Sequence, residues 1–107
     1  MTTGIVLYNI ELNGCLNGVF TNDGLSGVIY NEIAKIKGGA RSHDFSGIYD
    51  CFYFDRPDLR NDVELEISTS NGMYTFTWRN ITTRQAIFIG TGFLMNEKQI
   101  AVHYVSA

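Results

Sequence analysis

Apolar and polar residues alternate with a period of two along most of this chain, and this alternation restricts its fold more than any other feature. In "DVELEIST" (residues 62–69), Val63, Leu65 and Ile67 share one face of an extended chain, and acidic or hydroxyl residues occupy the other. This pattern is typical of a β-strand with one buried and one solvated face. "SNG" then precedes "MYTFTWRN", and because Asn and Gly tolerate a positive φ, the two runs predict a hairpin.

About eight such extended runs follow one another, and nearly all are linked by short turns. The run at 28–37, "VIYNEIAKIK", also fits a helix that aligns Ile29, Ile33 and Ile36, but its β-branched residues favour a strand. An antiparallel meander removes its unpaired edges by closing on itself. We therefore predict an all-β chain with a single domain over residues 1–107, folded as an antiparallel up-and-down β-barrel of about eight strands. A two-sheet β-sandwich is the alternative.

Composition and charge exclude several classes of protein. Hydrophobic residues make up 45% of the chain and charged residues 18%, which is too apolar for a disordered segment. The net charge is −3, and the cluster of Lys35, Lys37 and Arg41 is too small to neutralise a phosphate backbone, so no nucleic acid is expected as a partner. No membrane association is expected either, since no run approaches about 20 apolar residues. The first basic residue is Lys35, so the start lacks a positive signal-peptide region and a cytoplasmic location is expected.

Residues with catalytic chemistry are few. His43 precedes Asp44, but adjacent strand residues point to opposite faces, and we expect a turn there. His103 lies in an otherwise apolar strand, where a structural histidine is expected. Cys15 and Cys51 lack an identifiable activating base, and we expect free thiols in a reducing compartment, with a disulfide between them as the alternative. We predict no enzymatic activity.

No cofactor is indicated by the sequence, and a metal site is not expected. The acidic stretch "DRPDLRND" places Asp55, Asp58 and Asp62 close together, and these could offer oxygen ligands to calcium. Their spacing does not fit an EF-hand loop, and Arg56 and Arg60 offset their charge. We expect a solvated loop.

Short motifs recur in an order that resembles a known family. "GVFTN" (18–22) is followed closely by "GLSGVIY" (24–30), then by "FSGIYD" (45–50) and later by "TFTWRN" (75–80). This order resembles the strand rhythm of the avidin group of the calycin superfamily, to which the lipocalin-like small β-barrels also belong. The resemblance extends over roughly residues 14–93.

The resemblance implies a barrel that binds a small ligand. Asn22 and Tyr30 are then the residues that hydrogen-bond the ligand, and Trp78 is an apolar wall of the cavity. A barrel of about eight strands is wide enough either to be filled by its own side chains or to hold one small ligand. A filled interior is the safer expectation for a chain of this size, because a small domain has little apolar burial to give up.

The stretch "DFSGIYDCFYFD" (44–55) has aromatic residues on both faces. We favour the register in which Phe45, Tyr49 and Tyr53 face inward, because it leaves Asp50 in solvent. The opposite register would bury Asp50. The favoured register places two further aromatic side chains, Phe52 and Phe54, on the outer surface, where exposed aromatics mark an interface.

Two functions are consistent with these patterns. The first is a non-enzymatic calycin-like barrel that binds a small apolar or amphipathic ligand, and its proposed site residues are Asn22, Tyr30, Tyr49, Tyr74 and Trp78. The alternative is a protein-interaction module of an inhibitor or immunity type that meets a basic protein partner. That surface would consist of Phe52, Phe54, Asp58, Asp62 and Glu64, and its aromatics could also pair two copies as a homodimer.

Overall fold

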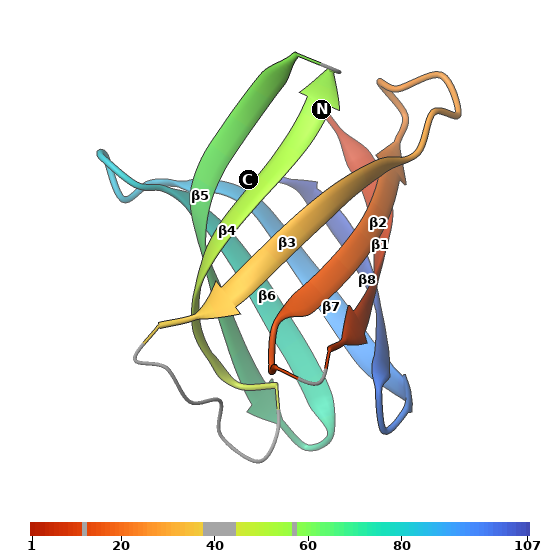
Figure 1. Cartoon of the computed structure of the whole chain (residues 1–107), viewed down its shortest axis with the longest axis vertical. Helices are drawn as coiled ribbons and strands as arrows, with labels where there is room; N and C mark the ends of the chain where they lie inside the picture. Colours follow the sequence, from red (N-terminus) through yellow and green to blue (C-terminus); the bar gives the residue numbers. More distant parts are fainter. Residues whose placement is uncertain (12, 38–44, 57) are drawn as a thin grey trace.

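Eight antiparallel strands close into a barrel in the computed structural model of the chain (Figure 1). The structure describes residues 1–11, 13–37, 45–56 and 58–107, with residue 55 described by its main chain only. The strands are β1 (Thr3–Ile10), β2 (Leu16–Asn22), β3 (Tyr30–Ile36), β4 (Gly47–Arg56), β5 (Leu59–Ser70), β6 (Met73–Asn80), β7 (Ala86–Asn96) and β8 (Gln99–Ser106). The predicted pair His43 and Asp44 and the side chain of Asp55 lie outside the described residues.

Each strand pairs with the next one in the sequence, and β1 closes the barrel by pairing with β8 from Thr3↔Val105 to Asn9↔Gln99. The predicted up-and-down barrel is therefore confirmed, and the sandwich is not formed. Residues 30–36 form a strand and not a helix. No helix in the described part of the chain is long and apolar enough to span a membrane.

The predicted register of β4 is confirmed. Phe45 and Tyr49 are buried and Asp50 is exposed. Phe52 is half-buried on the outside, where the guanidinium carbon of Arg60 lies 4.0 Å from the centre of its ring. Cys51 is buried and, like the half-buried Cys15, is a free thiol, so the alternative disulfide is not formed.

Side chains fill most of the barrel interior. The ring of Phe76 lies at its centre, 5.9 Å from the ring of Tyr8 and 5.7 Å from that of Trp78. Strand β7, which is paired with β6, gives these rings room. A Cβ atom at Gly92 would lie 2.8 Å from the carbonyl oxygen of Ala101 and 3.1 Å from the Phe76 ring. A filled core is thus confirmed over most of the barrel, and a small cavity lies at one end.

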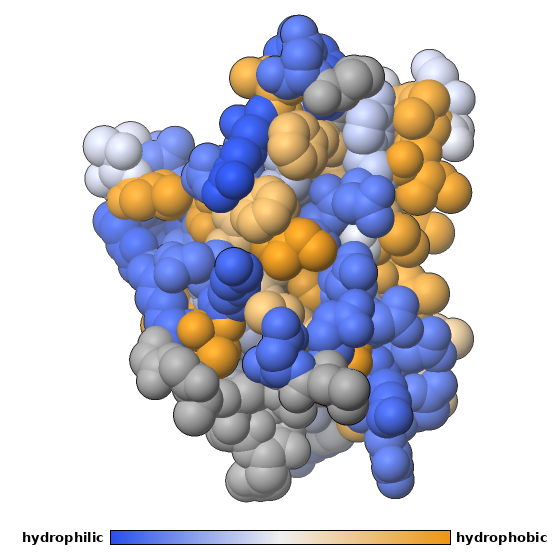
Figure 2. All heavy atoms as spheres, viewed as in Figure 1, coloured by the Kyte–Doolittle hydropathy of each residue, from blue (hydrophilic) through white to orange (hydrophobic). Residues whose placement is uncertain are grey.

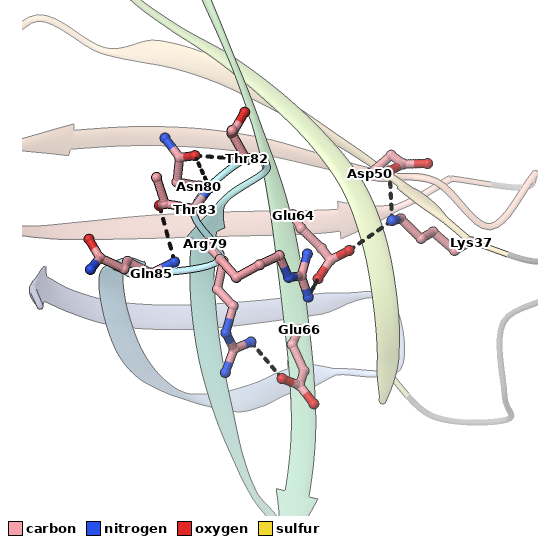
Figure 3. A network of polar contacts seen from close by, with 10 residues as sticks. Lys37, Asp50, Glu64, Glu66, Arg79, Asn80, Thr82, Thr83 and Gln85 are labelled. Carbon is pink, nitrogen blue, oxygen red and sulfur yellow. Dashed lines mark hydrogen bonds and ion pairs between the residues drawn. The ribbon is translucent and has the colours of Figure 1, made fainter.

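The outer surface of the barrel has two different halves. Ion pairs gather on the outside of β4, β5 and β6: Lys37 and Arg84 both bind Glu64, and Arg79 binds Glu66 (Figure 3). The outward positions of β7, β8, β1 and β2 are instead mostly apolar. Figure 2 shows hydrophobic surface along the edge of the molecule where Figure 1 places β1, β2 and β8.

Candidate functional site

A carboxylate lies inside the barrel. Glu32 of β3 is only 5% exposed, because the alternation of this strand directs Glu32 and Ala34 inward and leaves Ile33 half-exposed outside. Gly18 of β2 stands opposite Glu32, and a Cβ atom at Gly18 would lie 2.8 Å from the ring of Tyr8. The glycine therefore lets the Tyr8 ring of β1 cross over β2 and reach Glu32.

Three donors converge on one oxygen of this carboxylate. Glu32 Oε2 accepts a hydrogen bond from the Tyr8 hydroxyl, one from the Cys51 thiol at 3.1 Å and one from Trp78 Nε1 at 3.1 Å. Among the residues that the structure describes, no Lys, Arg or His side chain forms an ion pair with Glu32. The barrel thus holds a hydrogen-bonded acidic group that has no counter-charge within residues 1–11, 13–37, 45–56 and 58–107.

Burial shifts the pKa values of this cluster. Desolvation raises the pKa of Glu32, and the hydrogen bonds from Tyr8, Trp78 and Cys51 oppose that rise. Desolvation, followed by the nearby charge of Glu32, raises the pKa of the Tyr8 phenol and of the Cys51 thiol well above their ordinary values. Tyr8 and Cys51 therefore stay neutral donors at neutral pH, and Cys51 is not an activated nucleophile.

A cavity of about 50 Å³ opens beside this cluster, at the barrel end where β2 terminates. We call it the aromatic cavity, and its lining residues are Phe20, Asn22, Tyr53, Trp78, Phe88 and Tyr104. Five of the six are aromatic, and they come from five different strands. An apolar lining with few polar groups is typical of small-molecule sites, which usually measure about 300–1,000 Å³, and at about 50 Å³ this cavity has room for only a small group.

The rings of the aromatic cavity stand at steep angles to one another. The Phe20 and Tyr53 centroids are 5.7 Å apart with the ring planes at 90°, and those of Phe88 and Tyr104 are 5.5 Å apart at 79°. Trp78 lies 5.7 Å from Tyr104 at 56°. The rings therefore form walls around the space and do not close it by parallel stacking.

The polar groups of the cavity are held by local hydrogen bonds. Asn22 Nδ2 donates to the Tyr104 hydroxyl at 3.1 Å, and Asn22 Oδ1 accepts from the main-chain N–H of Gly24 at 2.9 Å. The Tyr104 hydroxyl in turn donates to the carbonyl oxygen of Thr21 at 3.3 Å. This orientation presents a fixed amide and phenol at the rim of the cavity.

Trp78 connects the cavity to the buried carboxylate. Its ring lines the cavity, while its N–H donates to Glu32. Burial raises the pKa of Tyr104, and the charge of Glu32 adds to that rise although the hydrogen bond from Asn22 opposes it. The negative charge therefore influences the cavity wall.

The ligand residues predicted from the sequence lie at two ends of the barrel. Asn22 and Trp78 both line the aromatic cavity, and Tyr30 packs next to it with its ring 6.3 Å from that of Phe20. Tyr49 and Tyr74 lie near the opposite end, where the Tyr49 hydroxyl donates to the carbonyl oxygen of Phe45 at 2.8 Å and the Tyr74 ring packs on the Phe45 ring. The structure thus brings together only part of the predicted set.

Most of the residues predicted for a protein interface have partners within the chain. Asp62 pairs with Arg60 at 2.9 Å, and Glu64 pairs with Lys37 at 2.7 Å and Arg84 at 2.6 Å. Hydrogen bonds from Arg84 and Lys37 lower the pKa of Glu64 to about 2. Asp58 is exposed, and half-buried Phe54 packs edge-on against Phe52 with the ring centroids 6.5 Å apart. The acidic surface offers a basic partner less unpaired charge than the sequence implies.

Sequence reasoning missed Glu32 and two of the aromatic residues that line the cavity, Phe20 and Tyr104. A signal for Glu32 was present, because a strand that directs Tyr30 inward must also direct Glu32 inward. Phe20 likewise shares its face with Asn22. Tyr8, the hydrogen-bond partner of Glu32, was missed as well.

An apolar groove of about 440 Å³ lies on the outside of the barrel, across β7, β8, β1 and β2. We call this region the apolar face. Several of its side chains are strongly exposed, among them Ile5 at 59%, Ile29 at 65% and Phe93 at 56%. His103, predicted to be structural, lines the groove between Ile5 of β1 and Thr91 of β7 and is hydrogen-bonded to the Thr3 hydroxyl at 3.2 Å.

Comparisons of the whole chain with known proteins gave no match to a family model, to a curated protein or to a solved structure. The closed eight-stranded antiparallel barrel is compatible with a calycin-like fold.

Proposed function

We propose that this protein is a non-enzymatic, calycin-like barrel that binds a small amphipathic ligand in the aromatic cavity. The convergence of five aromatic side chains with the Asn22 amide on one space carries this proposal. Aromatic walls supply apolar contact area, and a small number of placed polar groups fix the orientation of a ligand.

The size of the cavity limits the part of the ligand that enters. A water molecule takes about 30 Å³ in the liquid, so a volume of about 50 Å³ accepts a small group of the size of one or two water molecules. Because the cavity lies at the end of the barrel, the remainder of a larger ligand extends outward past Asn22. A filled barrel core is compatible with this mode of binding.

Trp78 provides a direct test, because it is the one tryptophan of the chain and it lines the cavity. We expect a small molecule that binds here to shift or quench the Trp78 fluorescence in a saturable manner. Asn22→Ala is expected to weaken that binding about three- to tenfold, the effect of one lost hydrogen bond. The exposed Asn31 serves as the matched control, since Asn31→Ala leaves the cavity intact. Saturable binding that Asn22→Ala leaves unchanged would contradict this site.

The apolar face supports a second candidate function, which is self-association. The outward strand positions of this face carry no Asp, Glu, Lys or Arg among the described residues. Two such faces meet without charge repulsion, as an isologous interface requires. An interface of standard size takes about 800 Å² from each partner, which is about one eighth of the 6321 Å² surface of this chain. The outer faces of four neighbouring strands suffice for this area, and we propose a second copy of the chain as the occupant.

Sedimentation velocity at tens of micromolar protein tests this second candidate. We expect the protein to sediment at twice its 12.0 kDa mass. Phe93→Asp, which places a charge on the apolar face, is expected to give monomers. Ile48→Asp is the control, because Ile48 is 40% exposed on β4 and lies outside the apolar face. A result that the wild-type protein is a monomer would contradict self-association, and it would not affect the proposed ligand site.

A further inference from the structure

We infer that the group which enters the aromatic cavity is a small organic cation of the alkylammonium type. This inference rests on the proposed ligand-binding function and specifies the chemistry of the ligand. Two independent observations support it: the aromatic walls of the cavity, and a buried acidic group behind one of those walls that pairs with no base among the described residues.

The walls of the cavity favour a positive charge. Aromatic rings carry partial negative charge on their faces, and a cation within about 6 Å of a ring centre is attracted to it. The steep angles between Phe20 and Tyr53 and between Phe88 and Tyr104 arrange the rings as a box around the space. Trp78, the ring type that binds cations most strongly, completes the box.

The buried carboxylate strengthens this preference. Trp78 donates its N–H to Glu32 at 3.1 Å, and a hydrogen bond to an anion polarises the donor group. At pH values above its folded pKa, Glu32 also acts on the cavity directly, as a negative charge across the indole in an interior where charges are poorly screened. Within the described ranges no basic side chain pairs with Glu32, whereas Glu64 and Glu66 on the outer surface are both paired with bases. A bound cation would supply the missing counter-charge.

Anions and neutral polar groups fit the cavity less well. None of its six lining residues is basic. The Asn22 oxygen already accepts from Gly24, and the Tyr104 hydroxyl already donates to Thr21. The ring faces are thus the main recognition element. A head group of one nitrogen and three methyl groups is larger than two water molecules, so part of it enters the cavity of about 50 Å³ and the rest lies at the mouth.

Choline and 3,3-dimethylbutan-1-ol form a matched pair of probes, because they have the same shape and differ in the charge of one central atom. Binding of each to the wild-type protein is measured by Trp78 fluorescence and by calorimetry at constant ionic strength. We expect choline to bind about tenfold more tightly than the alcohol, because the aromatic rings attract its ammonium charge and the alcohol has a neutral carbon at that position. Glu32→Gln, which keeps the side-chain shape, is expected to reduce this preference severalfold.

The outcomes separate the two proposals. Equal binding of both probes, or tighter binding of the alcohol, overturns the cation preference and supports a ligand site of neutral chemistry. Binding of neither probe to the folded protein overturns both proposals for this cavity. A choline preference that is unchanged in a folded Glu32→Gln variant overturns the role of the carboxylate. If that variant does not fold, the wild-type comparison of the two probes still decides whether the site selects a cation.

Discussion

Replacing Trp78 with alanine is expected to lower the free energy of unfolding by about 3–5 kcal/mol, as measured by urea denaturation. Trp78 is only 3% exposed, and its ring lies 5.7 Å from those of both Phe76 and Tyr104. The substitution therefore leaves a large space in the middle of the barrel. It also removes one of the three donors of Glu32, so a buried carboxylate loses part of its hydrogen bonding.

Two further variants distinguish loss of packing from a general effect of substitution. Trp78→Phe is expected to recover much of the stability, because it restores most of the ring volume but not the N–H. Met73→Ala removes a large side chain that is 48% exposed and lies outside the apolar face, and its effect is expected to stay within about 0.5 kcal/mol. A loss below about 1 kcal/mol for Trp78→Ala would show that the interior is not packed around this ring.

The barrel could be predicted because its local signals agree with one another. The alternation in residues 62–69 predicted a buried face, and Val63, Leu65 and Ile67 of β5 are buried. The predicted turn after it links β5 to β6. Strand direction follows from short turns, and closure follows from the need to remove edges. The run at 28–37 also fits a helix, but its β-branched residues favour a strand, and the strand Tyr30–Ile36 lies within it.

The candidate site could be predicted only in part, because the position of a residue along the barrel axis is a tertiary property. Tyr49 and Tyr74 face the interior as expected, but they lie near the end opposite Asn22. Glu32 was missed because acidic residues are normally assigned to the solvated face, and in β3 the apolar Ile33 takes the outer position instead.

The apolar face escaped prediction for a related reason. In β7 the inward positions include Gly90 and Gly92, which leave space for Phe76 and Val102. Ile89 and Phe93 of this strand point outward and are 44% and 56% exposed. Periodicity alone assigns the more apolar set of a strand to the core, and here that rule gives the wrong face because close packing requires the glycines inside.

The stability of this protein is expected to fall as pH rises above the ordinary Glu pKa of 4.5, and Glu32→Gln is expected to remove that component. Burial raises the pKa of Glu32 in the folded state, so the folded protein keeps this proton at pH values where the unfolded chain has released it. The stabilisation is complete below the unfolded pKa and is lost as pH rises through the folded pKa. Over that interval the slope approaches about 1.4 kcal/mol per pH unit.

The groups in contact with Glu32 do not obscure this measurement. Tyr8 and Cys51 remain protonated in the folded state through neutral pH, because burial raises the pKa of each well above its ordinary value. The free energy of unfolding of the wild type is therefore compared with that of Glu32→Gln between pH 4 and 8. As the pH rises, the free energy of unfolding of the wild type should fall relative to that of Glu32→Gln.

Glu64→Gln provides a control of opposite sign. Its ion partners lower the pKa of Glu64 to about 2, so its stabilising effect is present above the ordinary value of 4.5 and is lost as pH falls towards 2. Because Lys37 and Arg84 are both partly exposed, this effect is expected to be about 1 kcal/mol or less. A pH-independent difference between wild type and Glu32→Gln would mean that the hydrogen bonds from Tyr8, Trp78 and Cys51 offset the desolvation of Glu32, so that its pKa is the same in the folded and the unfolded chain. Glu32 would then be ionised at neutral pH, and the barrel would hold a buried negative charge that favours a cation in the aromatic cavity.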